Sequence, residues 1–172
     1  MKKLVLLLLA FVAFNLLLSA QDNYVAGKLF YTELGGPGVI MSANYDMRFD
    51  SNSRLGFGFR VGVGFISRNE YDINAQRIRT FYSFPVGLNY VFGNQKCAKT
   101  FEVGAGLTLL PPQTSLYNYY ENEESNAAGF LTFMYRNMPI DGGFSWRIGL
   151  TPLILKSGNL YPMGAFGIGA VF

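Results

Sequence analysis

The chain has 172 residues, enough for one domain; half of them are hydrophobic and only 15% are charged. It contains no histidine, which excludes every catalytic centre that relies on one, and its single cysteine excludes an internal disulfide. This composition also disfavours a zinc site, and we predict no metal, no cofactor and no enzymatic activity. No basic run suggests a nucleic-acid partner.

The first 20 residues have the layout of a cleaved secretory signal peptide. Two lysines precede an apolar run over residues 4–18, and the small residues Ser19 and Ala20 are followed by a polar stretch. We predict cleavage after Ala20, which leaves residues 21–172 as the mature domain with 12 basic and 11 acidic side chains. The alternative, a membrane anchor helix, would need roughly 20 apolar residues, more than this run provides.

The mature chain alternates large apolar residues with small or polar ones at period two, the pattern of β-strands. The clearest case is LGFGFRVGVGFI, where the phenylalanines and valines share one face and the glycines and Arg60 share the other. Eight such segments are predicted, and an even count is typical of bacterial outer-membrane barrels. They cover residues 28–34, 41–49, 55–66, 79–92, 101–110, 129–138, 144–154 and 166–172.

The large apolar face is predicted to point outward into lipid. The opposite face consists mostly of glycine with isolated charges, whereas a soluble surface would be rich in lysine and glutamate. Glycine inside a narrow barrel makes room for larger neighbours, and an aromatic content of 16% suits the two lipid–water interfaces. We therefore predict an all-β, eight-stranded antiparallel up-and-down transmembrane barrel. The alternative is a soluble, lipocalin-like barrel with the faces reversed.

The predicted connections differ between the two ends of the barrel. Short turns at the periplasmic end are expected over residues 50–54, 93–99 and 139–142. The external end has the longer polar loops that such barrels carry, together with two shorter connections; in chain order they cover residues 35–38, 68–77, 111–126 and 156–161. Pro85 and Pro152 fall inside predicted strands, where each removes a hydrogen-bond donor, so a bulge or a local break is expected at both.

Strand parity directs a set of charged side chains into the barrel. These are Asp46, Arg48, Arg60, Glu102, Arg136 and Arg147, joined by Glu33 if its strand keeps the register of ELGG. An eight-stranded barrel has an interior only wide enough for side chains, and unpaired buried charges are costly. We predict a packed salt-bridge network that stabilises the barrel; the alternative is a gated path for protons or ions.

Three other features have competing interpretations. A candidate external contact loop combines aromatic and acidic side chains: Tyr117, Tyr119, Tyr120, Glu121, Glu123 and Glu124. Such a loop suits surface contacts or a divalent cation, or is simply a solvated tip. Cys97 lies between lysines, which favours its thiolate, but the chain offers no redox partner, so an incidental cysteine is the simpler interpretation. The terminal Phe172 ends the last strand as an assembly signal would; the alternative is ordinary alternation.

The segments FYTELGGPGVIMSANYDMRF, FPVGLNYVFG, FEVGAGLTLL and DGGFSWRIGLTPLI resemble a family of small outer-membrane barrel proteins of Bacteroidetes, similar in architecture to OmpX and the OmpA membrane domain. The resemblance implies fold and location, with outer-membrane lipid and the barrel assembly machinery as partners. It carries no activity. Our leading hypothesis is a non-enzymatic structural or surface-contact protein with an extracellular ligand unknown. The alternatives are a narrow channel and, disfavoured by the absent histidine, a lipid- or lipopolysaccharide-acting enzyme.

Overall fold

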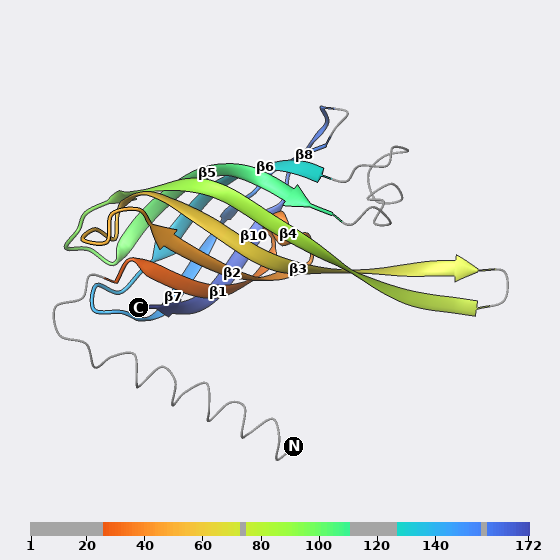
Figure 1. Ribbon diagram of the computed structural model, residues 1–172, viewed down its shortest axis with the longest axis horizontal. Coiled ribbons are helices and arrows are strands. Elements are labelled where there is room, and N and C mark those ends of the chain that lie inside the picture. The colour runs from red at the N-terminus through yellow and green to blue at the C-terminus, as the bar shows by residue number, and fades with distance from the viewer. Residues whose placement is uncertain (1–25, 73–74, 111–126, 156–157) are drawn as a thin grey trace, which may run out of the picture.

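The computed structural model describes residues 26–72, 75–110, 127–155 and 158–172, which form a closed antiparallel β-barrel (Figure 1). The predicted signal peptide and the loop over residues 111–126 lie outside the described residues. Strand segments and one 3₁₀ turn follow in this order: β1 (Lys28–Gly35), η1 (Gly36–Gly38), β2 (Met41–Arg48), β3 (Gly56–Asp72), β4 (Ala75–Gly93), β5 (Lys99–Leu109), β6 (Ala127–Asn137), β7 (Gly143–Leu150), β8 (Leu153–Ile154), β9 (Leu160–Tyr161) and β10 (Gly164–Val171).

These segments make eight barrel strands. β7 and β8 pair with β6 in one continuous register and form a single strand that is interrupted at Thr151 and Pro152. β9 and β10 continue one another in the same way. Each strand pairs with its neighbours in sequence, and β1 pairs with β10 to close the barrel. The predicted eight-stranded antiparallel barrel is therefore confirmed.

Both prolines interrupt the hydrogen bonding locally, as expected. Pro152 separates β7 from β8, although its carbonyl still accepts a hydrogen bond from the Leu131 N–H at 3.0 Å. Pro85 pairs with Thr108 of β5, and the β3–β4 ladder is interrupted beside it. The register of β3 against β4 is the same on both sides of this gap, so the proline causes a break and not a bulge.

The prediction of a loop over residues 68–77 is wrong. β3 and β4 remain paired in register as far as Asp72 and Ala75, and they form a two-stranded ribbon that projects from one end of the barrel (Figure 1). The pairing of β2 with β3 ends at Phe65, and the pairing of β5 with β4 ends at Phe84. Likewise, residues 160–161 of the last external connection belong to β9, and Lys99 already belongs to β5.

The faces of the barrel follow the predicted parity. Large apolar side chains cover the outside, where Phe57 is 65% exposed and Leu88 is 60% exposed. Polar and charged side chains fill the middle of the interior, and a buried apolar cluster lies on each side of them. No helix within the described residues is both long and apolar enough to cross a bilayer, an observation that does not bear on strands that cross one.

Candidate functional site

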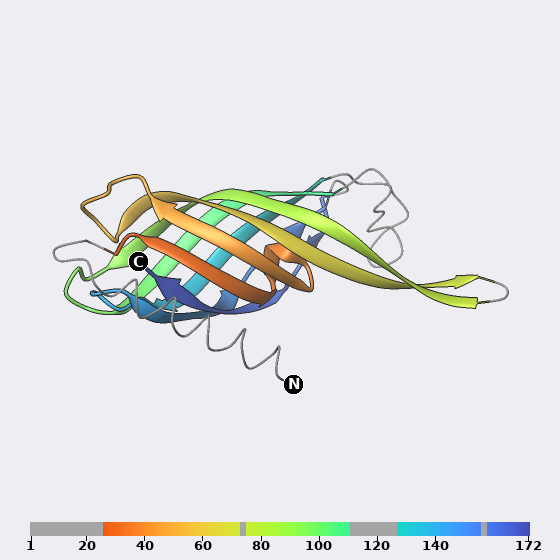
Figure 2. The ribbon, with the colours of Figure 1, turned by 60° about the horizontal axis from the view of Figure 1, so that its bottom comes forward.

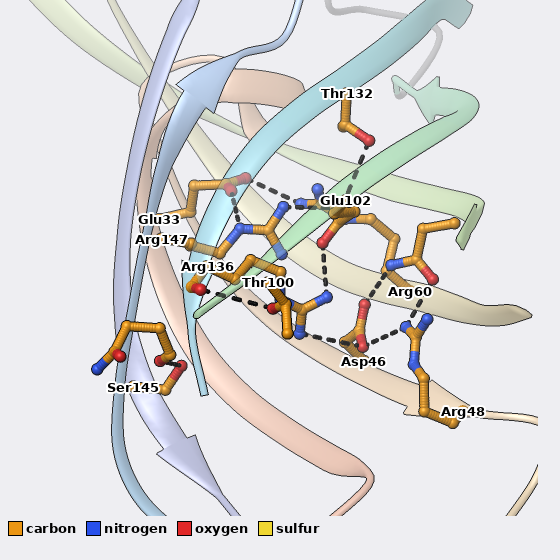
Figure 3. Close-up of polar contacts among 12 residues, drawn as sticks. Glu33, Asp46, Arg48, Arg60, Thr100, Glu102, Thr132, Arg136, Ser145 and Arg147 are labelled. Carbon is orange, nitrogen blue, oxygen red and sulfur yellow. Dashed lines mark hydrogen bonds and ion pairs between the residues drawn. The ribbon is translucent and has the colours of Figure 1, made fainter. Parts of the chain in front are cut away.

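Seven charged side chains form one unbranched chain of ion pairs across the barrel interior (Figure 3). Arginines and carboxylates alternate along it, with an arginine at each end. In order, the members are Arg48, Asp46, Arg136, Glu102, Arg147, Glu33 and Arg60. They are the seven residues that strand parity directs inward, and each is at most 2% exposed.

Each carboxylate in this ion-pair chain is shared by two arginines. Asp46 contacts Arg48 at 2.5 Å and Arg136 at 3.5 Å. Glu102 contacts the same Arg136 at 2.6 Å and Arg147 at 3.0 Å. These residues come from β2, β5, β6 and β7, so the contacts connect strands on different sides of the interior. Removing charges from water is costly, and the two cationic partners of each carboxylate help to offset that cost.

The third carboxylate, Glu33 of β1, joins Arg147 at 3.3 Å and Arg60 of β3 at 2.9 Å. The ring of Tyr31 lies beside these two arginines. Its centre is 4.6 Å from the guanidinium carbon of Arg147 and 5.6 Å from that of Arg60, and the Phe130 ring is 5.7 Å from Arg60. The electron-rich ring faces therefore supply part of the negative environment that four arginines facing three carboxylates require.

Two asparagines complete the network, and the sequence analysis did not identify them. Asn89 of β4 donates a hydrogen bond to Asp46 and accepts one from Arg48 at 2.6 Å, which brings β4 into the network. Asn44 accepts a hydrogen bond from Arg60 at 3.1 Å. Both asparagines are inward by the same parity that identifies the charged residues, so parity applied to neutral polar residues would have found them.

Inward-facing glycines make the space that these side chains occupy, as predicted. A Cβ added at Gly58 would lie 2.4 Å from the guanidinium carbon of Arg48. A Cβ at Gly167 of β10 would lie 2.9 Å from the Arg147 side chain. β10 contributes no charge to the ion-pair chain; its glycines instead admit the side chains of neighbouring strands.

The end of the barrel that carries the ribbon is filled by η1, which folds inward (Figure 2). The Thr108 hydroxyl donates to the Pro37 carbonyl at 2.7 Å, and the Ser83 hydroxyl donates to the Gly38 carbonyl at 3.2 Å. A Cβ at Gly38 would lie 2.4 Å from that of Ser42, so glycine is required for this close approach. The tight turn predicted at residues 35–38 is confirmed, and it also occupies the mouth of the barrel.

The opposite end is held together by Arg54, which the sequence analysis placed in a turn without a role. Its guanidinium donates to the carbonyls of Met138 at 2.9 Å and of Cys97. One buried side chain thus joins three turns that are distant in sequence. Burial lowers the pKa of the Arg54 guanidinium below its ordinary value.

Phe172 and Cys97, two further predicted site residues, form no contact with the ion-pair chain within the described residues. Phe172 exchanges two backbone hydrogen bonds with Lys28 where the barrel closes, and Cys97 is exposed in the turn between β4 and β5. The contact loop with Tyr117 and Glu121 lies outside the described residues. Within the described ranges, no three histidine, cysteine, aspartate or glutamate side chains are grouped to hold a metal ion.

Comparison with known proteins gave no match to a family model, a curated protein or a solved structure. The interpretation of the barrel therefore depends on its own residues.

Proposed function

We propose that the protein is exported, spans the outer membrane of a Gram-negative bacterium and acts there as a non-enzymatic surface-contact protein. One observation carries the membrane assignment: the barrel has a charged interior and an apolar exterior. A soluble barrel needs the opposite arrangement, because large exposed apolar patches favour association. A bilayer accommodates both faces, and a closed barrel leaves no unpaired strand edge in lipid.

The contact role is supported by the ribbon formed by the ends of β3 and β4. Beyond Phe65 and before Phe84, no third strand of the described residues pairs with either side of it. An unpaired edge presents backbone donors and acceptors to any extended segment that approaches. We infer that the ribbon, with the external loop at residues 111–126, meets an extracellular ligand, and that Phe172 and the last strand present the barrel to the assembly machinery.

The ion-pair chain supports a structural role for the interior in preference to a conduit. Its members cross the lumen and are held by two-sided contacts, and η1 occupies one mouth. Permeation would require these buried pairs to separate, which is costly. We expect no steady conductance when the protein is inserted in a planar bilayer; discrete, reproducible conductance steps would favour the channel instead.

The membrane assignment is tested by heat-modifiable gel migration and by labelling Cys97. The barrel refolded in detergent is expected to migrate differently before and after boiling. In intact cells an impermeant maleimide is expected to leave Cys97 unlabelled, and to label it once the outer membrane is permeabilised. As a control, the variant Cys97→Ser with Asn159→Cys carries its thiol at the other end and should be labelled in intact cells. Solubility without detergent and no heat shift would overturn the proposal.

A further inference from the structure

A hollow of about 420 Å³ lies on the outside of the barrel at the end where the short turns are. It forms where β2 runs into the connection over residues 49–55 and this connection passes beside β3 and β4. The wall includes Phe49, Asp50, Leu55, Gly56, Phe57 and Tyr90. Gly56 leaves open space on its side: an added Cβ there would meet nothing within 4 Å.

Three aromatic residues from neighbouring segments, Phe49, Phe57 and Tyr90, line this hollow. The Phe49 N–H donates to the Phe57 carbonyl at 2.9 Å, and Phe57 is paired in register with Tyr90. The Phe57 and Tyr90 rings meet edge to face, with centres 4.8 Å apart. Ring faces carry partial negative charge and attract cations, most of all ammonium and guanidinium groups.

The hollow also carries a negative charge, that of Asp50, which adds to the partial negative charge of the ring faces. Asp50 is exposed, and one of its carboxylate oxygens accepts a hydrogen bond from the Asn52 N–H at 2.9 Å. No ion pair of Asp50 is formed within the described part of the chain, and no basic side chain lines the hollow. The Ser53 hydroxyl is already engaged with Leu55 and Gln95, so it offers no free donor to an anion.

We propose that this hollow binds the ammonium headgroup of a phospholipid in the leaflet around the turn end, as in phosphatidylethanolamine. The ammonium lies against the aromatic rings and Asp50, and the acyl chains run along the exposed apolar face that includes Phe57 and Leu88. This inference depends on the proposed membrane location. Aromatic residues at a lipid–water interface are common in membrane proteins, but the site proposed here also predicts a preference for a lipid headgroup that carries an ammonium group.

The test is native mass spectrometry of the full-length mature protein in micelles that contain equal amounts of phosphatidylethanolamine and phosphatidylglycerol with the same acyl chains. The wild-type protein is expected to retain phosphatidylethanolamine about fivefold over phosphatidylglycerol, the size expected of one exposed cation–π contact with one exposed ion pair. Asp50→Asn and Tyr90→Leu should each reduce this ratio substantially toward one.

Matched controls are available at the same end of the barrel. Asp141 is an exposed acid in the turn before β7, and Phe144 is an exposed aromatic residue outside the hollow. Asp141→Asn and Phe144→Leu should preserve the fivefold preference. Equal retention of both lipids by the wild-type protein, or an equal loss in the control variants, would overturn the headgroup site. Absence of a heat-modifiable barrel in the same sample would instead overturn the membrane proposal.

Discussion

The guanidinium of Arg147 lies 4.6 Å from the centre of the Tyr31 ring, deep inside the barrel. Arg60 approaches the same ring at 5.6 Å, so one aromatic side chain faces two cations. The ion-pair chain has one more arginine than it has carboxylates, and this surplus lies where water is scarce. Tyr31 therefore acts as an additional, uncharged counterpart of the arginines.

This relationship predicts a small effect for one substitution of Tyr31 and a large effect for another. Its hydroxyl is buried and has no hydrogen-bond partner within the described structure, so Tyr31→Phe should change the free energy of unfolding by less than about 1 kcal/mol. Tyr31→Leu removes the ring from the two arginines and should destabilise the barrel by about 2 kcal/mol or more. Urea unfolding of the protein in detergent measures both values. Equal losses would show that the hydroxyl, and not the ring, is the important group.

The centre of the ion-pair chain should be more sensitive than its end. Glu102→Gln leaves Arg136 with its 3.5 Å contact to Asp46 and Arg147 with its contact to Glu33, and should cost about 3–5 kcal/mol, as broken buried pairs do. Arg60→Met leaves every carboxylate with at least one arginine and balances the charges at three against three. Its cost should be smaller by about 2 kcal/mol. The urea midpoints of the two variants, measured under identical conditions, compare these costs. A larger loss of stability for Arg60→Met than for Glu102→Gln would contradict the shared-carboxylate arrangement.

Packing of backbones through glycine gives a separate prediction. A Cβ at Gly106 would lie 2.2 Å from the Val86 carbonyl oxygen, whereas the nearest atom to a Cβ at Gly129 is 3.5 Å away. Gly106→Ala should therefore destabilise the barrel by about 1–3 kcal/mol, and Gly129→Ala should be tolerated. Thermal loss of the heat-modifiable form compares them directly. Similar transition temperatures for the two variants would mean that the strands adjust more readily than this geometry indicates.

The ribbon should be dispensable for folding and necessary for contact. Beyond the barrel it is supported by pairing between its own two strands. Replacing residues 68–79 with an Asn-Gly turn keeps Ser67 paired with Thr80 and should change the unfolding free energy by less than about 1 kcal/mol. Binding of cells that display the protein to an extracellular-matrix or host-cell extract is expected to fall in this variant. A misfolded variant would show that the ribbon belongs to the barrel core, and unchanged binding would assign contact to another external segment.

Strand parity was sufficient to predict the barrel and all seven members of the ion-pair chain. Most lie in strands whose other face is strongly apolar, so their direction is fixed by the alternation. Glu33 is the exception, because the outward face of β1 includes Lys28 and Thr32, and its prediction required the strand to keep its register. The partners of each charge could not be predicted, because pairing across a closed barrel depends on strand tilt and side-chain length as well as on parity. The role of Arg54 was not predicted for a different reason. This residue lies in a turn, where a period of two does not indicate which way a side chain points.

The ribbon was missed because its chemistry resembles that of a loop. Residues 68–77 are mostly polar, and a two-stranded segment outside a barrel has no apolar face to bury, so the alternation that identifies strands disappears. Only the continued register of β3 against β4 shows that β3 extends beyond Ile66 and that β4 begins before Arg79.

The pairing of β1 with β10 has a kinetic consequence. All other neighbouring strands are adjacent in sequence, so their contacts close shorter loops, whereas Lys28 and Phe172 lie at opposite ends of the barrel sequence. Closing that long loop is entropically the most expensive contact in the molecule, and it contributes nothing until the last strand is available. The barrel should therefore close late and cooperatively. Until β1 pairs with β10, a partly assembled sheet exposes two unpaired strand edges that can associate with other chains.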